Sequence, residues 1–311
     1  MVWSSAGVCP VWCWPPGHRM NWQGDQKPAL QIGLSARGFR ADFGTRCFEV
    51  GKIFTLPREG LSYSTTMRAT FLAYAWASSP ERIVVAAAVT LCFALLARGV
   101  RGVAQSGAVA GGIVCFALFA SAGPGAFAAL ATLFVATWTS TRLGYRRKQE
   151  LGLAERREGR NAWQVLANLV AAAVSALIFA ATGTHVWLNA MIAALAAAAA
   201  DTVASEIGQS IRRDARMITT GKRVPAGTDG GITVPGTAAG LAASVAVTAV
   251  AAATGVIDPR CIWIPVVAGF AGMVLDSILG ATLQRRGWIS NEGVNLWSTL
   301  AAAVAAYAVR P

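Results

Sequence analysis

Charged residues are scarce in this sequence, and several common motifs are missing. Only 14% of its 311 residues are Asp, Glu, Lys or Arg, whereas 55% are hydrophobic. Because an average soluble domain contains about 25% charged residues, the composition excludes an ordinary soluble protein. No Gly-x4-Gly-Lys-Ser/Thr segment occurs, which excludes a P-loop nucleotidase. Cys9 and Cys13 have the spacing of half a zinc site, but no second pair of Cys or His completes the four ligands that a structural site needs.

Long apolar runs, by contrast, are abundant. Each is long enough, or nearly so, for a membrane span of about 20 residues. The runs lie at 83–97, 103–121, 126–141, 163–182, 186–203, 233–254, 262–282 and 295–309. We predict an all-α, polytopic integral membrane bundle of about eight transmembrane helices over residues 83–311, preceded by a juxtamembrane segment at 67–82.

The first part of the chain has a different character. Residues 1–66 are rich in Trp, Pro, Gly and Arg, show no sustained helical or strand period, and contain no span-length apolar run. They also lack the basic region followed by an apolar core that marks a signal peptide. Two interpretations remain open: a poorly structured tail, or a mis-assigned start upstream of Met67.

The basic residues follow the predicted membrane. The chain has 27 Lys and Arg against 15 Asp and Glu, but their placement argues against nucleic acid as a partner. With alternating spans, one side receives Arg98, Arg101, Arg142, Arg146, Arg147, Lys148, Arg156, Arg157, Arg160, Arg212, Arg213, Arg216, Lys222, Arg223, Arg285 and Arg286. The short loops of the other side receive only Arg260. Since cytoplasmic loops collect Lys and Arg, we predict a multi-pass protein of the cell membrane with these basic loops in the cytoplasm and both termini outside.

A dense polar segment, residues 200–208, closes an Ala-rich run. Asp201 and Glu206 lie at or just inside the edge of the hydrocarbon layer, where an ionisable group is a candidate functional residue. On a helix Asp201 and Ser205 share one face, and Thr202 and Glu206 share the neighbouring one. Carboxylate and hydroxyl oxygens are the ligands expected for Mg²⁺. We predict that Asp201 and Glu206 hold Mg²⁺; the alternative is that they only make polar contacts at the interface.

The loop that follows combines positive charge with glycine. Its residues are Arg212, Arg213, Arg216, Lys222, Arg223, Gly227, Thr228, Asp229, Gly230 and Gly231, just ahead of the span that begins near Thr233. Glycines let backbone N–H groups approach an anion, and a helix N-terminus adds partial positive charge. The segment predicts a phosphate-binding loop. Ordinary charges flanking a tight turn would explain the basic residues but less easily the run Gly-Thr-Asp-Gly-Gly.

A third polar group lies near the end of the chain. Asp276, Gly280 and Gln284 recur at four-residue intervals and line one helical stripe, and a small residue between two polar ones lets a helix or ligand come close. Asp276 lies about two turns from Arg285 and is predicted to face the bundle interior as a further metal ligand. Gln284, and Asn295 at the mouth of the last span, are either part of the binding site or make helix–helix hydrogen bonds.

The order of these motifs resembles the membrane family known as domain of unknown function 92, whose relatives include plant phytyl-phosphate kinase and animal transmembrane protein 19. The matching pieces are Ala136-Thr137 to Gly144-Tyr145 with Lys148, residues 164–168, residues 200–208, Gly227 to Gly231, and residues 276–284. They cover most of residues 83–311. Asp229 departs from the family pattern, because the aligned loop often reads Gly-Thr-Asn-Gly-Gly.

The resemblance implies phosphorylation of a prenyl monophosphate to a diphosphate by a nucleoside triphosphate. The pattern Asp-x-x-Ala-x-x-x-Gly from Asp201 to Gly208 resembles CTP-using polyprenol kinases, which favours CTP. On this interpretation three acids, Asp201, Glu206 and Asp276, hold Mg²⁺. Lys222 and the Gly227 to Gly231 backbone cradle the triphosphate, and the prenyl tail lies between helices. The alternative is a cation- or proton-coupled transporter that uses the same acids, although no convincing pair of inverted repeats supports it.

Overall fold

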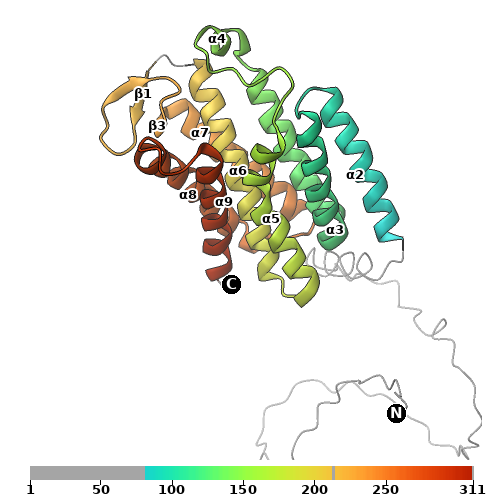
Figure 1. Ribbon diagram of the computed structural model, residues 1–311. Coiled ribbons are helices and arrows are strands. Elements are labelled where there is room, and N and C mark those ends of the chain that lie inside the picture. Colours follow the sequence, from blue (N-terminus) through green and yellow to red (C-terminus); the bar gives the residue numbers. More distant parts are fainter. Residues whose placement is uncertain (1–80, 212–213, 310–311) are drawn as a thin grey trace, which may run out of the picture. The chain divides into compact units, whose positions relative to one another are not determined.

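The computed structural model describes residues 81–211 and 214–309. The predictions for residues 1–66, for nearly all of the juxtamembrane segment, and for Arg212 and Arg213 therefore lie outside the described residues. The elements are α2 (Arg82–Gly99), α3 (Gln105–Arg142), α4 (Tyr145–Glu150), α5 (Ala162–Thr182), α6 (Val186–Ile211), β1 (Asp214–Met217), β2 (Arg223–Pro225), β3 (Gly231–Ile232), α7 (Val234–Ala253), η1 (Pro259–Cys261), α8 (Trp263–Leu279), η2 (Gly280–Gln284) and α9 (Asn291–Ala308) (Figure 1).

The prediction of a polytopic all-α membrane protein is confirmed, but the count of eight spans is not. Six segments are long and apolar enough to cross a membrane: α2, α3, α5, α6, α7 and Pro259–Gln284. Two differences account for the lower number. The predicted spans at 103–121 and 126–141 both lie within α3, and α9 begins with the polar residues Asn291 and Glu292 and is not among the six.

Helix α3 nevertheless reverses direction within its length. Its backbone is non-helical at Gly123, with φ 80° and ψ −171°, and Pro124 follows. The carbonyl of Val100, just before α3 begins, accepts hydrogen bonds from Trp138 Nε1 at 3.2 Å and Arg142 Nη2 at 2.7 Å near its end. The two ends of α3 therefore lie together, and its halves run antiparallel. The left-handed region favours glycine, and Pro suits the first position of a helix, so these residues place the reversal.

Helix α6 forms the centre of the bundle. It packs against α3, α5, α7, α8 and α9, and every residue from Met191 to Ala200 is at most 2% exposed. Alanine side chains let the neighbouring helices approach closely. A Cβ at Gly240 of α7 would lie 2.7 Å from the Ala200 carbonyl oxygen, and one at Gly269 of α8 would lie 2.7 Å from Ala196 Cβ. This close packing places Asp201, the next residue of α6, among the other helices.

A small antiparallel sheet with the order β2-β1-β3 follows α6. Arg216 of β1 is paired with Arg223 of β2 and with Ile232 of β3. The predicted phosphate-binding loop, Gly227 to Gly231, connects β2 to β3. Its last residue, Gly231, is the first residue of β3. The sequence pattern predicted a loop here but not the sheet that anchors both of its ends.

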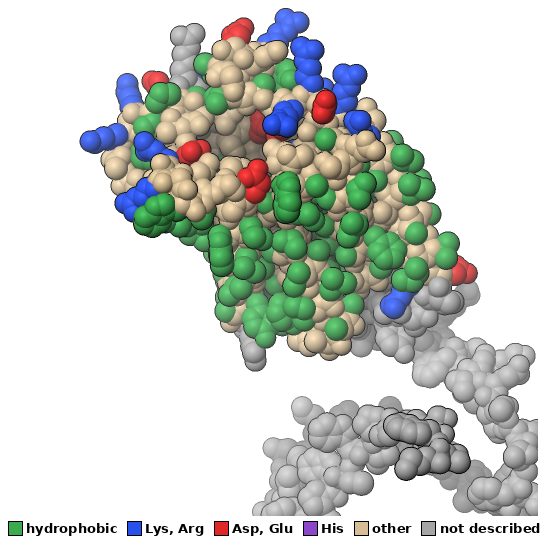
Figure 2. Space-filling model, in the orientation of Figure 1, with side chains coloured by type: hydrophobic (Ala, Val, Ile, Leu, Met, Phe, Trp, Pro, Cys, Tyr) green, Lys and Arg blue, Asp and Glu red, His purple; other side chains and the backbone are tan. Residues whose placement is uncertain are grey.

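The basic connections gather at one end of the bundle, named here the basic end and defined as residues 98–104, 142–161, 214–233 and 285–290. Arg147 Nη1 donates to the carbonyls of Ser210 and Ile211, at 3.0 Å and 3.2 Å. Figure 2 shows Lys and Arg side chains concentrated at this end, above a flank rich in hydrophobic side chains. The predicted segregation of charge is thus present in the fold, and the assignment of this end to the cytoplasm stays a prediction.

Cysteine labelling tests that assignment. In a variant without the native cysteines, Glu150→Cys and Thr219→Cys at the basic end are expected to be protected from an impermeant thiol reagent added to intact cells, because basic loops stay in the cytoplasm. Arg260→Cys, in the connection between α7 and α8 at the other end, is expected to react. Permeabilised cells provide the control, in which all three react. Labelling of Thr219→Cys from outside would reverse the topology.

Candidate functional site

Two acidic side chains from different helices meet next to the basic end. The carboxyl groups of Asp201 on α6 and Asp276 on α8 lie within hydrogen-bonding reach of each other. Ser298 of α9 donates its hydroxyl to Asp276 Oδ2 at 3.1 Å. Two carboxylates this close repel each other when both are ionised, so the pair requires a bound cation or a shared proton. The fold thus brings together two of the three acids predicted to hold Mg²⁺, and binding of the ion stays a prediction.

The glycine loop docks directly beside this pair. Asp276 lies four residues before Gly280, where α8 changes to the π-helical turn η2; such turns are rare and frequently occur at functional sites. A Cβ at Gly280 would lie 3.0 Å from the Gly230 nitrogen, and one at Gly230 would lie 2.4 Å from Ala281 Cβ. The absence of side chains at both glycines is what lets the loop backbone rest on η2.

Asp229, the residue that departs from the family pattern, occupies this docked loop. Its carboxyl interacts electrostatically with Asp276 and with the Arg285 guanidinium. Partial burial raises the pKa of Asp229 above its ordinary value, and Arg285 offsets part of that increase. The loop thus brings a third acid towards the Asp201–Asp276 pair together with an arginine that partly neutralises it.

Substitutions of two glycines measure how much this docking stabilises the protein. Gly230 and Gly221 both have positive φ, 75° and 68°, so alanine is strained at either position by about 1–2 kcal/mol. Only at Gly230 does the new Cβ also collide with Ala281, since nothing lies within 4 Å at Gly221. We expect Gly230→Ala to cost about 1–3 kcal/mol more than Gly221→Ala, measured by thermal unfolding in detergent. Equal losses would show that the loop does not depend on its contact with η2.

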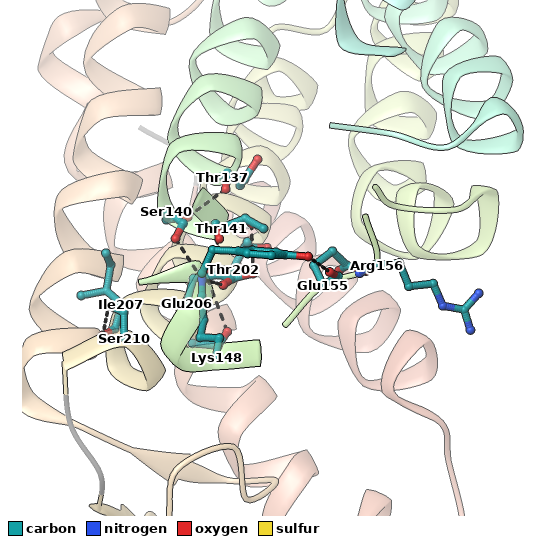
Figure 3. Close-up of polar contacts among 12 residues, drawn as sticks. Thr137, Ser140, Thr141, Lys148, Glu155, Arg156, Thr202, Glu206, Ile207 and Ser210 are labelled. Carbon is teal, nitrogen blue, oxygen red and sulfur yellow. Dashed lines mark hydrogen bonds and ion pairs between the residues drawn. The ribbon is translucent and has the colours of Figure 1, made fainter. Parts of the chain in front are cut away.

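Glu206 is directed away from the carboxyl pair. Its Oε1 accepts from the Thr141 hydroxyl at 3.0 Å, and its Oε2 forms an ion pair with Lys148. The Lys148 ammonium is fully buried and also donates to the carbonyls of Ser140, at 3.2 Å, and Thr141, at 2.8 Å. Figure 3 shows Lys148, Thr141 and Ser140 around Glu206. This ion pair fastens α4 and the end of α3 to α6.

The expectation that Asp201, Glu206 and Asp276 surround one cation therefore needs correction. Residues five positions apart on a helix lie about 140° apart around its axis, so Asp201 and Glu206 face different neighbours. Within residues 81–211 and 214–309, no group of three or more His, Cys, Asp and Glu side chains is placed to hold a metal ion. Asp201 and Asp276 are brought together, and Glu206 is not.

The other predicted residues have varied positions. Thr202 accepts from Arg160 Nη1 at 3.4 Å, whereas Ser205 donates at 2.6 Å to the Asp201 carbonyl of its own helix. Asn295 is 8% exposed, and its carbonyl accepts from the hydroxyls of Ser298 and Thr299. Gln284 ends η2, and Lys222 is exposed at the turn between β1 and β2. No contact in the described part of the chain joins Lys222 to the Asp201–Asp276 pair.

Two residues next to the pair were not singled out from the sequence. Arg160 precedes α5 and interacts electrostatically with Asp201, and Ser298 bonds Asp276. Ser298 lies one helical turn after Asn295 and could have been found from that spacing. Arg160 had no such local signal, because a backbone bridge to Val103 and a hydrogen bond from the Ala104 N–H to its carbonyl at 2.9 Å determine its position.

Comparison with known families agrees with this motif order. Residues 88–303 match the family described as integral membrane protein DUF92. The chain belongs to this family. The resemblance inferred from the motifs is thereby confirmed, and Lys148, Asp201, Asp229 and Asp276 all lie within the matched region.

Several curated proteins are similar to this chain. An uncharacterized membrane protein of Synechocystis sp. is 37% identical over 182 residues, which cover 57% of this chain and 70% of that protein. An uncharacterized membrane protein of Methanocaldococcus jannaschii is 30% identical over 222 residues, covering 70% and 90%. Protein VTE6, chloroplastic, of Arabidopsis thaliana is 29% identical over 206 residues, covering 63% of this chain and 62% of VTE6, less than two thirds of its length. No solved structure matches.

Proposed function

We propose that this chain is an integral membrane kinase that transfers the terminal phosphoryl group of a nucleoside triphosphate to a prenyl monophosphate. The observation that carries the proposal is the Asp201–Asp276 carboxyl pair, held between α6 and α8 beside a docked glycine loop. The prenyl substrate comes from the family resemblance, and the match to VTE6 supports it. CTP is the favoured donor because residues 201–208 resemble the motif of CTP-using polyprenol kinases.

The donor set of the pair suits Mg²⁺. Asp201 and Asp276 present carboxylate oxygens, and Ser298 holds one of them in place at 3.1 Å. Mg²⁺ is usually bound by one or two carboxylates and completes its coordination with water and substrate phosphates, so two acids suffice. Asp201 and Asp276 would hold the ion, which when bound neutralises negative charge on the transferring phosphoryl group.

The reaction requires little proton chemistry from the protein. An oxygen of the prenyl monophosphate forms a bond to the terminal phosphorus of the triphosphate, the bridging P–O bond breaks, and a nucleoside diphosphate leaves. A phosphate monoester already carries a charge of about −1.5 to −2 at pH 7, so its oxygen can attack without a general base. The protein has to position two anionic groups in line and balance their charge. Arg160, which interacts with Asp201, and Arg285, which interacts with Asp229, place positive charge near the pair.

The revised geometry changes the role expected for Lys222. Lys222 is exposed at a hairpin turn, so its side chain is not fixed in a position to contact a triphosphate. Arg285, by contrast, interacts with Asp229 of the docked loop. Asp229 adds a negative charge where the family often has Asn, and the Arg285 guanidinium compensates that charge. We therefore assign the charge-balancing role in this loop to Arg285.

A separate apolar cavity lies along the membrane part of the bundle. It has a volume of about 300 Å³, lies between α5 and α9, and includes Leu296, Leu300, Val304 and Tyr307 on the α9 side. Leu296 is two residues before Ser298, which bonds Asp276, and so lies about 200° from it around the axis of α9. We propose that this cavity holds an apolar tail of a lipid whose charged head stays at the basic end.

A direct assay tests the proposal. Purified protein in neutral detergent is incubated with Mg²⁺, CTP or ATP labelled in the terminal phosphate, and a panel of prenyl monophosphates. We expect label in a prenyl diphosphate, and none when Mg²⁺ is chelated. Absence of transfer with each common nucleoside triphosphate would remove the kinase proposal. Cation-dependent uptake into proteoliposomes that is lost in Asp201→Asn would then favour the transporter.

A further inference from the structure

A second cavity at the basic end is rich in arginine. It has a volume of about 280 Å³ and is lined by Arg101, Gly102, Thr137, Trp138, Thr141, Arg142, Tyr145, Glu155, Arg156, Arg157, Gly159 and Arg160. Five positively charged side chains thus surround it against one carboxylate. The loops before α3 and α5 and the second half of α3 form its walls.

Tight backbone contacts hold these walls in place. The Arg160 N–H donates to the Gly102 carbonyl at 3.2 Å, and a Cβ at Gly159 would lie 2.5 Å from the Gly102 carbonyl carbon. Gly159 itself has φ 84°. Arg101 has φ 56° and is the one non-glycine residue of the described chain with a positive φ. Strained backbone of this kind concentrates at functional sites, and here it determines where an arginine enters the cavity.

Positive charge exceeds negative charge around the cavity, with five arginines against Glu155 in its lining and Asp201 beside Arg160. None of its five arginines forms an ion pair with a carboxylate of the described residues. The two carboxylate oxygens of Glu155 already accept hydrogen bonds, from the Arg156 N–H at 3.1 Å and from Gln164 Nε2 at 3.5 Å. Arg142 stacks over the Trp138 ring, 5.4 Å from its centroid, which fixes its guanidinium. Planar guanidinium groups that outnumber the carboxylates around them and form no ion pair are suited to phosphate, which they bind through paired hydrogen bonds.

The cavity adjoins the carboxyl pair through Arg160. This residue lines the cavity, donates to Thr202 at 3.4 Å, and interacts with Asp201. Thr141, on the same wall, bonds Glu206. The volume is near the lower limit of the range for drug-sized ligands, about 300–1,000 Å³, and suits a small anion better than a whole nucleotide.

We infer that this arginine cavity binds a phosphate or diphosphate group and that Arg160 joins it to the Asp201–Asp276 pair. No residue of the glycine loop lines it, so on the proposed function the chain has two separate places for phosphate. The anion binding stands by itself, whereas its role in presenting a phosphoryl group rests on the proposed function. The phosphate could belong to a soluble nucleotide or to a lipid head group, and the test separates these sources.

Binding of inorganic pyrophosphate tests the inference. The full chain in neutral detergent, without Mg²⁺ and without prenyl substrate, is titrated with pyrophosphate in a calorimeter. The double variant Arg101→Gln/Arg157→Gln is expected to bind about tenfold more weakly or worse, because each lost charge-assisted hydrogen bond weakens binding on that order. Arg156 is left unchanged, so that only two of the five lining arginines differ from the wild type.

The matched control removes two charges from the same end outside the cavity. Arg98→Gln/Arg286→Gln has the same net charge as the pocket variant, and we expect less than about a threefold change at 0.15 M salt, where distant charges are screened. Arg101→Lys/Arg157→Lys, which retains the charge, is expected to recover part of the affinity and shows that the site still folds. Displacement of pyrophosphate by CTP assigns the site to a nucleotide, and displacement by a prenyl monophosphate assigns it to a lipid head group.

Absence of pyrophosphate binding by the wild-type chain would overturn the inference, as would equal weakening in the pocket and control variants. Failure of the kinase assay with pyrophosphate binding intact would remove the proposed function but leave this site standing. Kinase activity that is unchanged in Arg101→Gln/Arg157→Gln, with pyrophosphate binding lost, would separate the site from the reaction.

Discussion

Asp201→Asn and Asp276→Asn are each expected to lower the rate of phosphoryl transfer about a hundredfold or more. Asparagine keeps the size of the side chain and, at position 276, an oxygen that can accept from Ser298. It removes the negative charge that would hold Mg²⁺. Loss of one electrostatic contact that acts on the transition state commonly costs a few kcal/mol of barrier. The measurement is transfer of labelled phosphate in detergent, with Mg²⁺ titrated for each variant.

Asp214→Asn provides the matched control, because it removes an exposed acid from β1 at the same end. Its activity is expected to stay within about twofold of wild type, since surface charges are screened. Unchanged elution and thermal unfolding show that each variant is folded. Wild-type activity in Asp276→Asn would rule out the pair as the metal site, even if the chain proves to be a kinase.

Lys148→Met is expected to lower the free energy of unfolding by about 3–5 kcal/mol. The substitution removes one member of a buried ion pair and leaves the Glu206 carboxylate, whose side chain is 13% exposed, without its partner. An unpaired buried charge is strongly destabilising. The carbonyls of Ser140 and Thr141 also lose their donor. Unfolding by a denaturing detergent or by heat measures the loss.

A double variant distinguishes this structural role from metal binding. Lys148→Met/Glu206→Leu removes both charges and is expected to recover most of the stability, because replacing both members of such a pair is often close to neutral. Glu206→Gln alone is expected to destabilise the protein without altering its Mg²⁺ requirement. A shifted Mg²⁺ requirement in a fully stable Glu206→Gln variant would return Glu206 to the metal site.

The local features of the fold could be predicted from the sequence because they depend on neighbouring residues. Hydropathy located the long helices and helix halves within a few residues, except that α6 continues to Ile211, past the predicted end at 203, and the short helix α4 was missed. The Gly123-Pro124 pair accounts for the reversal inside α3. The placement of Lys and Arg anticipated the basic end. The order of the motifs was enough to identify the family, because that order can be recognised in the sequence without knowing any contact between the helices. The run of alanines before Asp201 indicated a helix, although not that this helix is the centre of the bundle.

Contacts between helices were decided only by the tertiary structure. The spacing of Asp201 and Glu206 already places them on different sides of α6. Which neighbour each one meets depends on how α6 is rotated against α3 and α8, and the sequence of α6 does not contain that information. The arginine cavity likewise requires Gly102 and Gly159, 57 positions apart, to bring two loops into backbone contact. Side-chain pairing across a bundle follows from which helices pack closely, and here alanines and glycines spread over α6, α7 and α8 determine that packing. The sequence alone identified the three candidate acids, Asp201, Glu206 and Asp276. The packing of the helices determined that Asp201 and Asp276 are the two that meet.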